Sequence, residues 1–361
     1  MRRVRPAAPH LAAVEAYDPK YLPARAFLSA NENPSDVEEG VRREISRELA
    51  RVALNRYPDP LANALRDQIA EAYGLGRDRV LVGNGGDELL FDVALAWGGA
   101  GRTFLNLPPT FSVYEANAQL TGTTTASIPR RADFSVDEES VLRRVGQGDI
   151  DYVVLTSPNN PTGNATDPSF VERLLEATDA LVVVDEAYGE FGGRSVAELL
   201  SGHENLLVLH TFSKAYALAG ARMGYVLGSP AVIGELTKVR QPYSVNALSQ
   251  AAASVVFRNR DRFAPGIRAI VAERGRVTAE LASMDGVSPY PSDANFVLVR
   301  VPQAHRVWER LYDRGVLVRD FSGHPMLPDC LRVSIGTRQE NDMFLEALAE
   351  VLGQEGQEVG R

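Results

Sequence analysis

The sequence predicts an α/β fold with a mostly parallel sheet, joined to a smaller α+β domain. Over most of the 361-residue chain, short apolar runs typical of buried strands alternate with helical patterns, which indicates βαβ units. Beyond residue 245 the pattern changes to two helical stretches, followed by alternating strands and a final helix. We therefore expect a large domain over residues 36–245. A small domain would contain residues 246–361 together with the N-terminal arm, residues 1–35.

Composition and charge narrow the possible partners. The net charge of −9, without a basic block, argues against nucleic acid and anionic membranes. No apolar run approaches the roughly 20 residues that span a membrane. The single cysteine, Cys330, cannot form an intrachain disulfide, which favours a reducing compartment and predicts a cytoplasmic protein. The five histidines are scattered without a His-x-x-x-His pair, so we expect no metal site.

Helices are expected where apolar residues recur at helical spacing, and strands where short apolar runs occur. In the large domain, the expected helices cover residues 37–54, 61–73 and a stretch after residue 88 that ends at residue 97. The expected strands there are residues 80–82, 104–107, 152–155, 181–184 and 206–209. In the small domain we expect helices at 244–258, 265–284 and 304–314, and strands at 295–301, 316–321 and 331–336. Thr337 and Glu340 form a capping box that opens a last helix, and the proline-punctuated arm is expected to have little structure of its own.

Polar motifs directly follow the predicted strands of the large domain. These motifs are residues 83–88, 108–114, 157–163, 185–188 and 210–225. Parallel sheets bind their ligands beyond the carboxyl ends of the strands. We therefore expect the five motifs to form one shared active site.

Lys214, Ser213 and Arg222 suggest a site for pyridoxal 5'-phosphate (PLP). A lysine just past a buried strand can be partly desolvated, which lowers its pKa and makes the amine a nucleophile toward carbonyls. The serine hydroxyl and the arginine beside it can hold a phosphate. PLP combines an aldehyde with a phosphate group. The alternative is that Lys214 is an ordinary surface lysine.

Asp185 could serve the ring of the same cofactor. A carboxylate against the pyridine nitrogen would keep that nitrogen protonated, so that the ring can accept electrons. Tyr188 and Asn160 could hydrogen-bond the phenolic oxygen of the ring, and Phe111 could stack on it. The alternatives are a helix N-cap for Asp185 and an ordinary core position for Phe111.

Two further features suggest bound anions. Gly83-Asn-Gly-Gly-Asp-Glu88 lies between a strand and a helix, where glycines and free N–H groups form an anion cradle. The alternative is a plain turn with Asp87 as the N-cap. Arg319 and Arg332 fall on neighbouring strands of the small domain, and an arginine within an apolar strand requires an anion. The alternative is a pair of surface arginines.

Together these residues resemble the histidinol-phosphate aminotransferase family of fold type I PLP-dependent enzymes. The resemblance runs nearly end to end and rests on these segments: Asn31-Glu-Asn-Pro34, Arg56-Tyr-Pro-Asp59, Gly83–Glu88, Pro109–Tyr114, Pro158–Gly163, Asp185–Tyr188, Ser213–Arg222, Ala294–Phe296 and Leu331–Thr337. It implies a large domain with a mostly parallel seven-stranded sheet. It also implies a homodimer whose subunits share the active sites.

The resemblance further implies a role for each site residue. Lys214 would bind the cofactor covalently and would act in catalysis with Asp185 and Tyr188. The cofactor phosphate would be bound by Gly86, Asp87, Ser213 and Arg222, and by Tyr57 from the other subunit. The ring would contact Phe111, Asn160, Asp185 and Tyr188. The substrate pocket would contain Tyr17, Asn31, Arg319 and Arg332.

The implied activity is transamination between L-histidinol phosphate and 2-oxoglutarate, a step of histidine biosynthesis. Several departures from the family pattern concern the substrate more than the chemistry. Tyr17-Asp-Pro-Lys20 replaces the usual Tyr-x-Pro-Gly, and the arm after Pro34 lacks the usual Gly-Pro. His210 stands where the family usually has arginine, and Phe111 where it often has tyrosine.

Alternatives of the same fold are an aromatic amino-acid aminotransferase and a threonine-phosphate decarboxylase. A PLP-binding regulator without turnover is another alternative, but the presence of Lys214, Asp185 and both pocket arginines argues against it. A serine hydrolase is disfavoured because the sequence has no Gly-x-Ser-x-Gly elbow.

Overall fold

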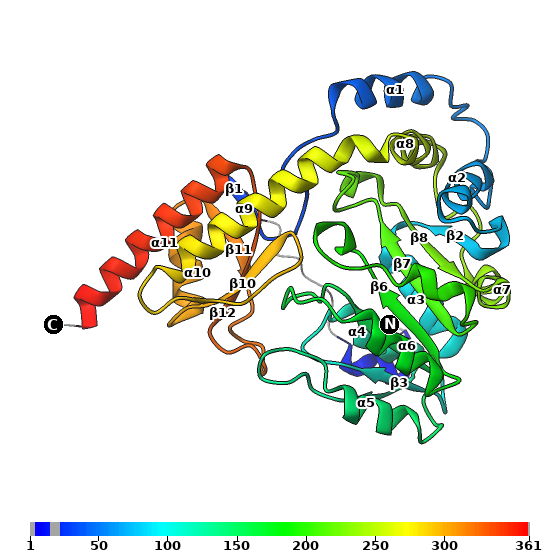
Figure 1. Ribbon diagram of the computed structural model, residues 1–361, viewed down its shortest axis with the longest axis horizontal. Helices are drawn as coiled ribbons and strands as arrows, with labels where there is room; N and C mark the ends of the chain where they lie inside the picture. Colours follow the sequence, from blue (N-terminus) through cyan, green and yellow to red (C-terminus); the bar gives the residue numbers. More distant parts are fainter. Residues whose placement is uncertain (1–3, 15–21, 360–361) are drawn as a thin grey trace.

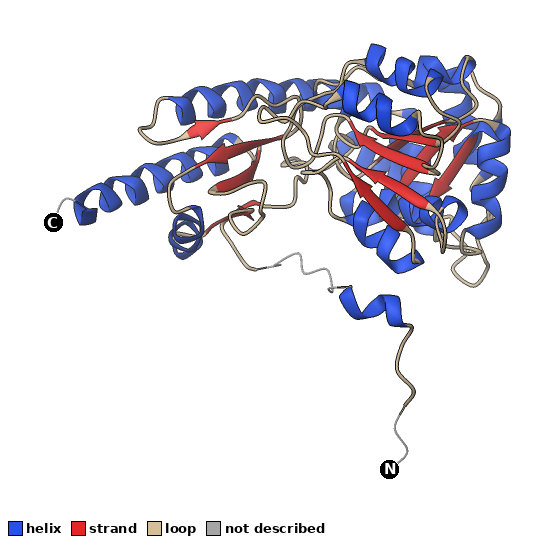
Figure 2. Ribbon diagram, turned by 90° about the horizontal axis from the view of Figure 1, so that it is seen from below, coloured by secondary structure: helices blue, strands red, loops and turns tan. Residues whose placement is uncertain are grey.

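The computed structural model describes residues 4–14 and 22–359 of the chain. These residues form two β-sheets that lie in separate parts of the molecule, each packed against its own helices (Figures 1 and 2). In this described part, no helix combines the length and the apolar character needed to cross a bilayer.

The larger sheet has seven strands in the order β2-β8-β7-β6-β5-β3-β4. The strands are β2 (Val80–Gly83), β3 (Thr103–Asn106), β4 (Thr124–Ser127), β5 (Tyr152–Thr156), β6 (Leu181–Asp185), β7 (Leu206–Thr211) and β8 (Gly224–Gly228). β8 is antiparallel to both of its neighbours, and the other pairs are parallel. The predicted α/β fold with a mostly parallel seven-stranded sheet is confirmed.

The larger sheet is buried on both faces, which explains its continuous apolar strands. Along β6, Val182 and Val184 pack into one core, whereas Leu181 and Val183 pack into another. The helices of this part are α1 (Glu39–Leu49), α2 (Asn63–Tyr73), α3 (Gly85–Trp97), α4 (Val113–Thr121), α5 (Glu138–Val145), α6 (Pro168–Glu176), α7 (Pro230–Val239) and α8 (Ala247–Arg258). Short 3-10 helices are Pro9–Ala13, Arg77–Arg79, Gly189–Phe191, Ala197–Ser201, Ala219–Ala221 and Arg260–Phe263.

The smaller sheet has the strand order β1-β11-β12-β10-β9. Its strands are β1 (Ala26–Leu28), β9 (Ser288–Pro289), β10 (Phe296–Arg300), β11 (Val316–Asp320) and β12 (Cys330–Ser334). The helices α9 (Ala264–Ala282), α10 (Ala304–Asp313) and α11 (Arg338–Val359) contact this sheet, and a separate apolar core lies between them. This arrangement is a smaller α+β unit, as the sequence predicts.

The N-terminal arm contributes a strand to the smaller sheet. β1 pairs in parallel with β11, and the N–H groups of Arg25 and Ala26 both donate to the carbonyl oxygen of Gly315. The expectation that the arm has little structure of its own is therefore wrong for residues 26–28. Three residues are too short for a recognisable strand pattern, and β1 is stabilised by pairing with a strand 290 positions away in the register Ala26↔Val316.

Helix α8 packs on α1 and α2, and its buried residues Ala253, Val255 and Val256 belong to a core of the larger sheet. The long helix α9 then leads to the smaller sheet (Figure 1). The division of the chain into domains at residue 245 stays a prediction.

Candidate active site

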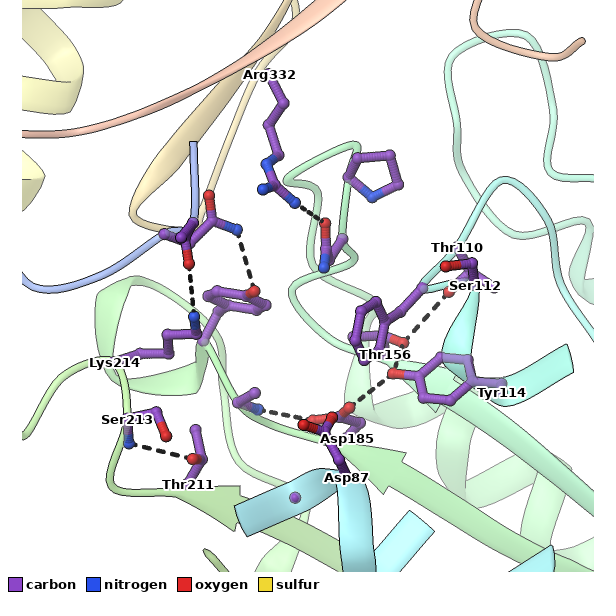
Figure 3. A pocket seen from close by; sticks show the side chains of 18 of the residues that line it. Asp87, Thr110, Ser112, Tyr114, Thr156, Asp185, Thr211, Ser213, Lys214 and Arg332 are labelled. Atoms are coloured by element: carbon purple, nitrogen blue, oxygen red, sulfur yellow. Dashed lines mark hydrogen bonds between the residues drawn. The ribbon is translucent and has the colours of Figure 1, made fainter. Parts of the chain in front are cut away.

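A cavity of about 380 Å³ lies at the carboxyl ends of β5, β6 and β7, and residues from both sheets line it (Figure 3). All five polar motifs contribute to its wall, so they meet in one place, as the sequence predicts. The cavity-lining residues that were expected in the site are Asn31, Gly86, Asp87, Phe111, Asn160, Asp185, Tyr188, Ser213, Lys214, Arg222, Arg319 and Arg332. Their individual roles stay predictions.

Two expected site residues are not part of this wall. Tyr57 is 82% exposed, and its ring stacks on that of Tyr243 with a centroid distance of 4.6 Å. Tyr57 therefore cannot serve the cavity of its own chain in this position. Tyr17 falls within residues 15–21, outside the residues that the structure describes.

Lys214 follows β7 and reaches the cavity (Figure 3). Its Nζ donates a hydrogen bond to the carbonyl oxygen of Ala30 at 2.8 Å. Burial, aided by the positive charge of Arg332, lowers the pKa of Lys214 to about 8. A neutral amine is therefore more populated at neutral pH than in an exposed lysine, and the neutral amine is the nucleophilic form.

Asp185 is the last residue of β6 and is almost fully buried. Its Oδ2 accepts a hydrogen bond from the hydroxyl of Tyr114 at 2.6 Å, and its Oδ1 accepts one from the backbone N–H of Ala187 at 3.0 Å. Burial raises the pKa of Asp185 to about 6, and the two hydrogen bonds oppose that rise. A buried carboxylate with this environment is suited to hold a cationic partner.

Hydrogen bonds link the cavity-lining residues of the smaller sheet and the N-terminal segment to those of the larger part. Asn31 Nδ2 donates to the hydroxyl of Tyr188 at 3.1 Å. Arg332 donates to Asn160 Oδ1 at 2.6 Å and to the carbonyl oxygen of Ser29 at 2.6 Å. These bonds connect the smaller sheet and the N-terminal segment to loops that follow β5 and β6.

Arg319 and Arg332 lie directly opposite each other on β11 and β12. The prediction that they occupy neighbouring strands is confirmed. Like charges directly opposite each other destabilise an antiparallel pair of strands. Both side chains line the cavity, and Arg332 is only 7% exposed. An anionic ligand in the cavity could interact with both guanidinium groups.

The turn between β2 and α3 forms a cup with Arg222. Gly85 has a φ of +83°, and a Cβ atom there would lie 2.7 Å from Nη2 of Arg222. Arg222 donates to Asp87 Oδ2 at 3.0 Å, and its Nη1 lies 3.5 Å from the hydroxyl oxygen of Ser213. Together with the N–H groups of the first helical turn, these groups can bind a phosphate. The N-cap of α3 is Asn84, so the alternative with Asp87 as the N-cap is wrong.

His210, the departure from the family pattern, does not line the cavity. It is a buried residue of β7, and its ring stacks on Tyr225 with a centroid distance of 5.0 Å. Its Nε2 lies 3.5 Å from a carboxylate oxygen of Glu186. Burial lowers the pKa of His210 to about 4 and raises that of Glu186 to about 7. The histidine is therefore neutral at neutral pH and packs against the carboxyl group without a full ion pair.

Sequence reasoning missed Tyr114 and Thr156, which both line the cavity. The hydroxyl of Tyr114 contacts Asp185 and, at 2.7 Å, the hydroxyl of Thr156. The ring of Tyr114 lies edge-on to Phe111, with centroids 5.6 Å apart. Their positions at or after strand ends could have predicted that Tyr114 and Thr156 line the site. The hydrogen bonds that join Thr156 to Tyr114 and Tyr114 to Asp185 could not be predicted, because the three residues come from different elements. In the described residues, no group of His, Cys, Asp and Glu side chains could hold a metal ion.

Comparison with known proteins identifies relatives over most of the chain. The family described as "Aminotransferase class I and II" matches residues 27–348. "Histidinol-phosphate aminotransferase 1" from Carboxydothermus hydrogenoformans is 40% identical over 342 residues, 94% of this chain and 97% of the relative. "Histidinol-phosphate aminotransferase" from Thermococcus gammatolerans is 41% identical over 336 residues, 93% of this chain and 94% of the relative. The crystal structure of histidinol-phosphate aminotransferase from Sinorhizobium meliloti in complex with pyridoxal-5'-phosphate has a TM-score of 0.87 at 26% identity, covering 98% of this chain and 99% of that chain.

Proposed function

Because the chain belongs to the aminotransferase class I and II family, we propose that it is a PLP-dependent aminotransferase of histidine biosynthesis. The proposed reaction converts L-histidinol phosphate and 2-oxoglutarate into imidazole-acetol phosphate and L-glutamate. One observation carries the chemistry: an amine of lowered pKa, a buried carboxylate and a phosphate cup line the same cavity. The names of the relatives at 40% and 41% identity support the choice of substrate.

The residues of the cavity fit PLP. When bound, PLP would supply an aldehyde that condenses with amines and a ring that accepts electrons from the substrate. Ser213, Arg222 and the first turn of α3 would hold the phosphate, and Asp185 would hold the proton on the ring nitrogen. Tyr188 and Asn160 would bind the ring oxygen. These assignments use residues that already lie around one space, and the glycine at position 85 leaves room for Arg222 beside it.

Lys214 would have two tasks. Its neutral amine would hold the cofactor, and when it is free the same amine would move a proton at the substrate α-carbon. The pKa of about 8 supports both tasks, because the amine can accept and return a proton near neutral pH. The carbonyl oxygen of Ala30, 2.8 Å from Nζ, would hold the amine in place while it is free.

We also propose that the protein is a cytoplasmic homodimer. Tyr57 would reach the cofactor phosphate of the partner subunit, as the family resemblance implies. The exposure of Tyr57 supports this role, because an aromatic side chain that is 82% exposed has surface to bury against another chain. Leu54, which is 80% exposed, lies close to it in the sequence.

One preparation of holoprotein tests both the cofactor and the substrate. After borohydride reduction, mass spectrometry should find a pyridoxyl group on Lys214. The chain has two other lysines, Lys20 and Lys238, so peptide mapping separates the possibilities. A pyridoxyl group on either of these would contradict the assignment.

Each amino donor is then mixed alone with the unreduced holoprotein in a single turnover. Histidinol phosphate and glutamate should both bleach the yellow cofactor absorbance. If the protein ignored histidinol phosphate but responded to phenylalanine or tyrosine, an aromatic amino-acid aminotransferase would replace the proposal. Release of carbon dioxide from threonine phosphate would instead favour a decarboxylase.

A further inference from the structure

The hydroxyl of Tyr114 is buried between two other polar groups. Tyr114 lies on α4 and is 2% exposed. Its oxygen lies 2.6 Å from Asp185 Oδ2 and 2.7 Å from Thr156 Oγ1 (Figure 3). The three groups come from α4, β6 and β5, so the fold rather than a local motif brings them together.

The directions of these hydrogen bonds follow from the number of protons. An ionised carboxylate can only accept, so Tyr114 must donate to Asp185. The phenol has one proton, and therefore Thr156 must donate to Tyr114. Burial and the negative charge of Asp185 raise the pKa of Tyr114 well above its usual value, so the phenol stays a neutral donor. Thr156 and Tyr114 therefore form a series of hydrogen bonds in which each hydroxyl donates toward Asp185. In such a series each hydrogen bond strengthens the next.

Some of the other groups around Asp185 favour its ionised form, and others disfavour it. The backbone N–H of Ala187 donates to the second carboxylate oxygen, and the positive charge of Lys214 also favours the anion. Burial and the negative charge of Asp87 on α3 disfavour the anion. Tyr114 therefore supplies the side-chain hydrogen bond that opposes the cost of burying the carboxylate.

We propose that Tyr114 is a positioning residue that decides where the proton lies between Asp185 and the ring nitrogen of the cofactor. Asp185 and that nitrogen would compete for one proton. A hydrogen bond to Oδ2 makes the carboxylate the weaker base, so the proton stays on the nitrogen, where it is needed for electron uptake. Thr156, by donating a hydrogen bond to Tyr114, would also favour the proton on the ring nitrogen. This inference rests on the proposed use of PLP.

The test is the protonation state of the cofactor in the Tyr114→Phe variant. Phenylalanine keeps the ring and removes only the hydroxyl. A hydrogen bond to a charged group favours that charge by about 10- to 150-fold in equilibrium. Holoprotein loaded with ¹⁵N-labelled PLP should show a protonated ring nitrogen by ¹⁵N NMR. In Tyr114→Phe the resonance should move toward that of an unprotonated pyridine.

Two controls separate this effect from simple loss of packing. The ³¹P resonance of the bound cofactor reports the phosphate cup, and it should stay unchanged in Tyr114→Phe. Tyr152→Phe changes another tyrosine of the same apolar core, whose ring stacks on Phe104 and which does not line the cavity. Both resonances should stay unchanged in that variant.

Thr156 supplies a second, milder test if Tyr114→Phe fails to fold. Thr156→Val should move the ¹⁵N resonance in the same direction by a smaller amount. Thr156→Ser keeps the hydroxyl donor, so its ¹⁵N resonance should match that of the wild type. An unchanged ¹⁵N resonance in Tyr114→Phe, or parallel changes of the ¹⁵N and ³¹P resonances, would overturn the inference. Wild-type protein that binds no PLP would instead contradict the proposed function.

Discussion

The cavity has two sides that are built in different ways. One side, which we propose binds the cofactor and call the cofactor side, contains Gly86, Asp87, Asp185, Ser213, Lys214 and Arg222. The other, which we propose binds the substrate and call the substrate side, contains Asn31, Arg319 and Arg332. On the cofactor side, most functional groups lie at or just after the ends of strands in the larger sheet, and Arg222 lies just before β8. On the substrate side, they are held by contacts between distant parts of the chain: Arg332 binds Ser29, 303 positions away, and Asn160, 172 positions away.

This difference suggests that the two sides respond differently to change. The cofactor side belongs to a sheet that is buried on both faces, so its geometry depends on the two apolar cores that cover those faces. The substrate side depends on how the smaller sheet and the N-terminal segment lie against the larger part. We therefore expect changes on the cofactor side to affect every substrate alike. Changes on the substrate side should separate one substrate from another.

The largest expected effect concerns Asp185 on the cofactor side. Asp185→Ala should retain cofactor under saturating PLP, because the phosphate cup and Lys214 are intact. Removing one partner of a buried charge pair costs about 3–5 kcal/mol. If all of this cost appears in the transition state, turnover falls by about two to four decades. Turnover and cofactor content of the purified variant are the measurements.

Asp92→Ala is the matched control for that variant. Asp92 is also buried, at 3% exposure, and lies on α3 beside the larger sheet, but it does not line the cavity. Its replacement should leave turnover per bound cofactor close to that of the wild type. Near-normal turnover of Asp185→Ala with every amino donor would show that Asp185 has no catalytic role.

The two sides also differ in how far the sequence could predict them. Apolar runs located the buried strands closely: residues 181–184 were expected and β6 is Leu181–Asp185. β4 was missed because it forms no apolar run: three of its four residues, Thr124–Ser127, carry hydroxyl groups, and the strand lies at the sheet edge. β8 was missed because it begins and ends with glycine, a residue that weakens strand patterns.

Most cofactor-side residues were predictable because strand-end motifs are local. The bond between Tyr114 and Asp185 was not, since it joins residues 71 positions apart that are brought together by the packing of α4 on the sheet. On the substrate side the arginines themselves were predictable from their apolar strands. The carbonyl oxygens of Ser29 and Ala30, which bind Arg332 and Lys214, were not, because any residue can supply a backbone acceptor.

An intermediate effect is expected for the two arginines of the substrate side. They are opposite in register, but Arg332 is buried and held by two acceptors, whereas Arg319 is half-buried. Glutamate presents an α-carboxylate, and histidinol phosphate presents a phosphate, which has a third oxygen and more charge. We expect Arg332 to serve both substrates and Arg319 to serve chiefly the phosphate.

Arg319→Ala should therefore slow the histidinol-phosphate half-reaction by about 10- to 150-fold, the value of a hydrogen bond to a charged group, and the glutamate half-reaction by less. Arg332→Ala should slow both. Single-turnover bleaching with each donor measures the two half-reactions separately. Arg300→Ala, on an exposed position of β10 in the same sheet, is the control and should slow neither. Equal losses for both donors in Arg319→Ala would end the proposed division of labour.

The smallest effect tests whether the cofactor side is complete within one chain. If Tyr57 binds the phosphate of the partner subunit's cofactor, Tyr57→Ala should lower activity by about 10-fold, the lower bound for a hydrogen bond to a charged group. Lys214→Ala should be inactive by itself. In a heterodimer of the two variants, one site would combine an intact Lys214 with an intact Tyr57 from the other chain.

Mixed subunits should therefore regain activity above the Tyr57→Ala level per intact Lys214. Mixing Tyr57→Ala with a Lys214→Ala/Tyr57→Ala double variant is the control, and it should give no gain. If subunits exchange but activity does not recover, Tyr57 acts on its own chain, which would require its exposed, Tyr243-stacked ring to move into the cavity.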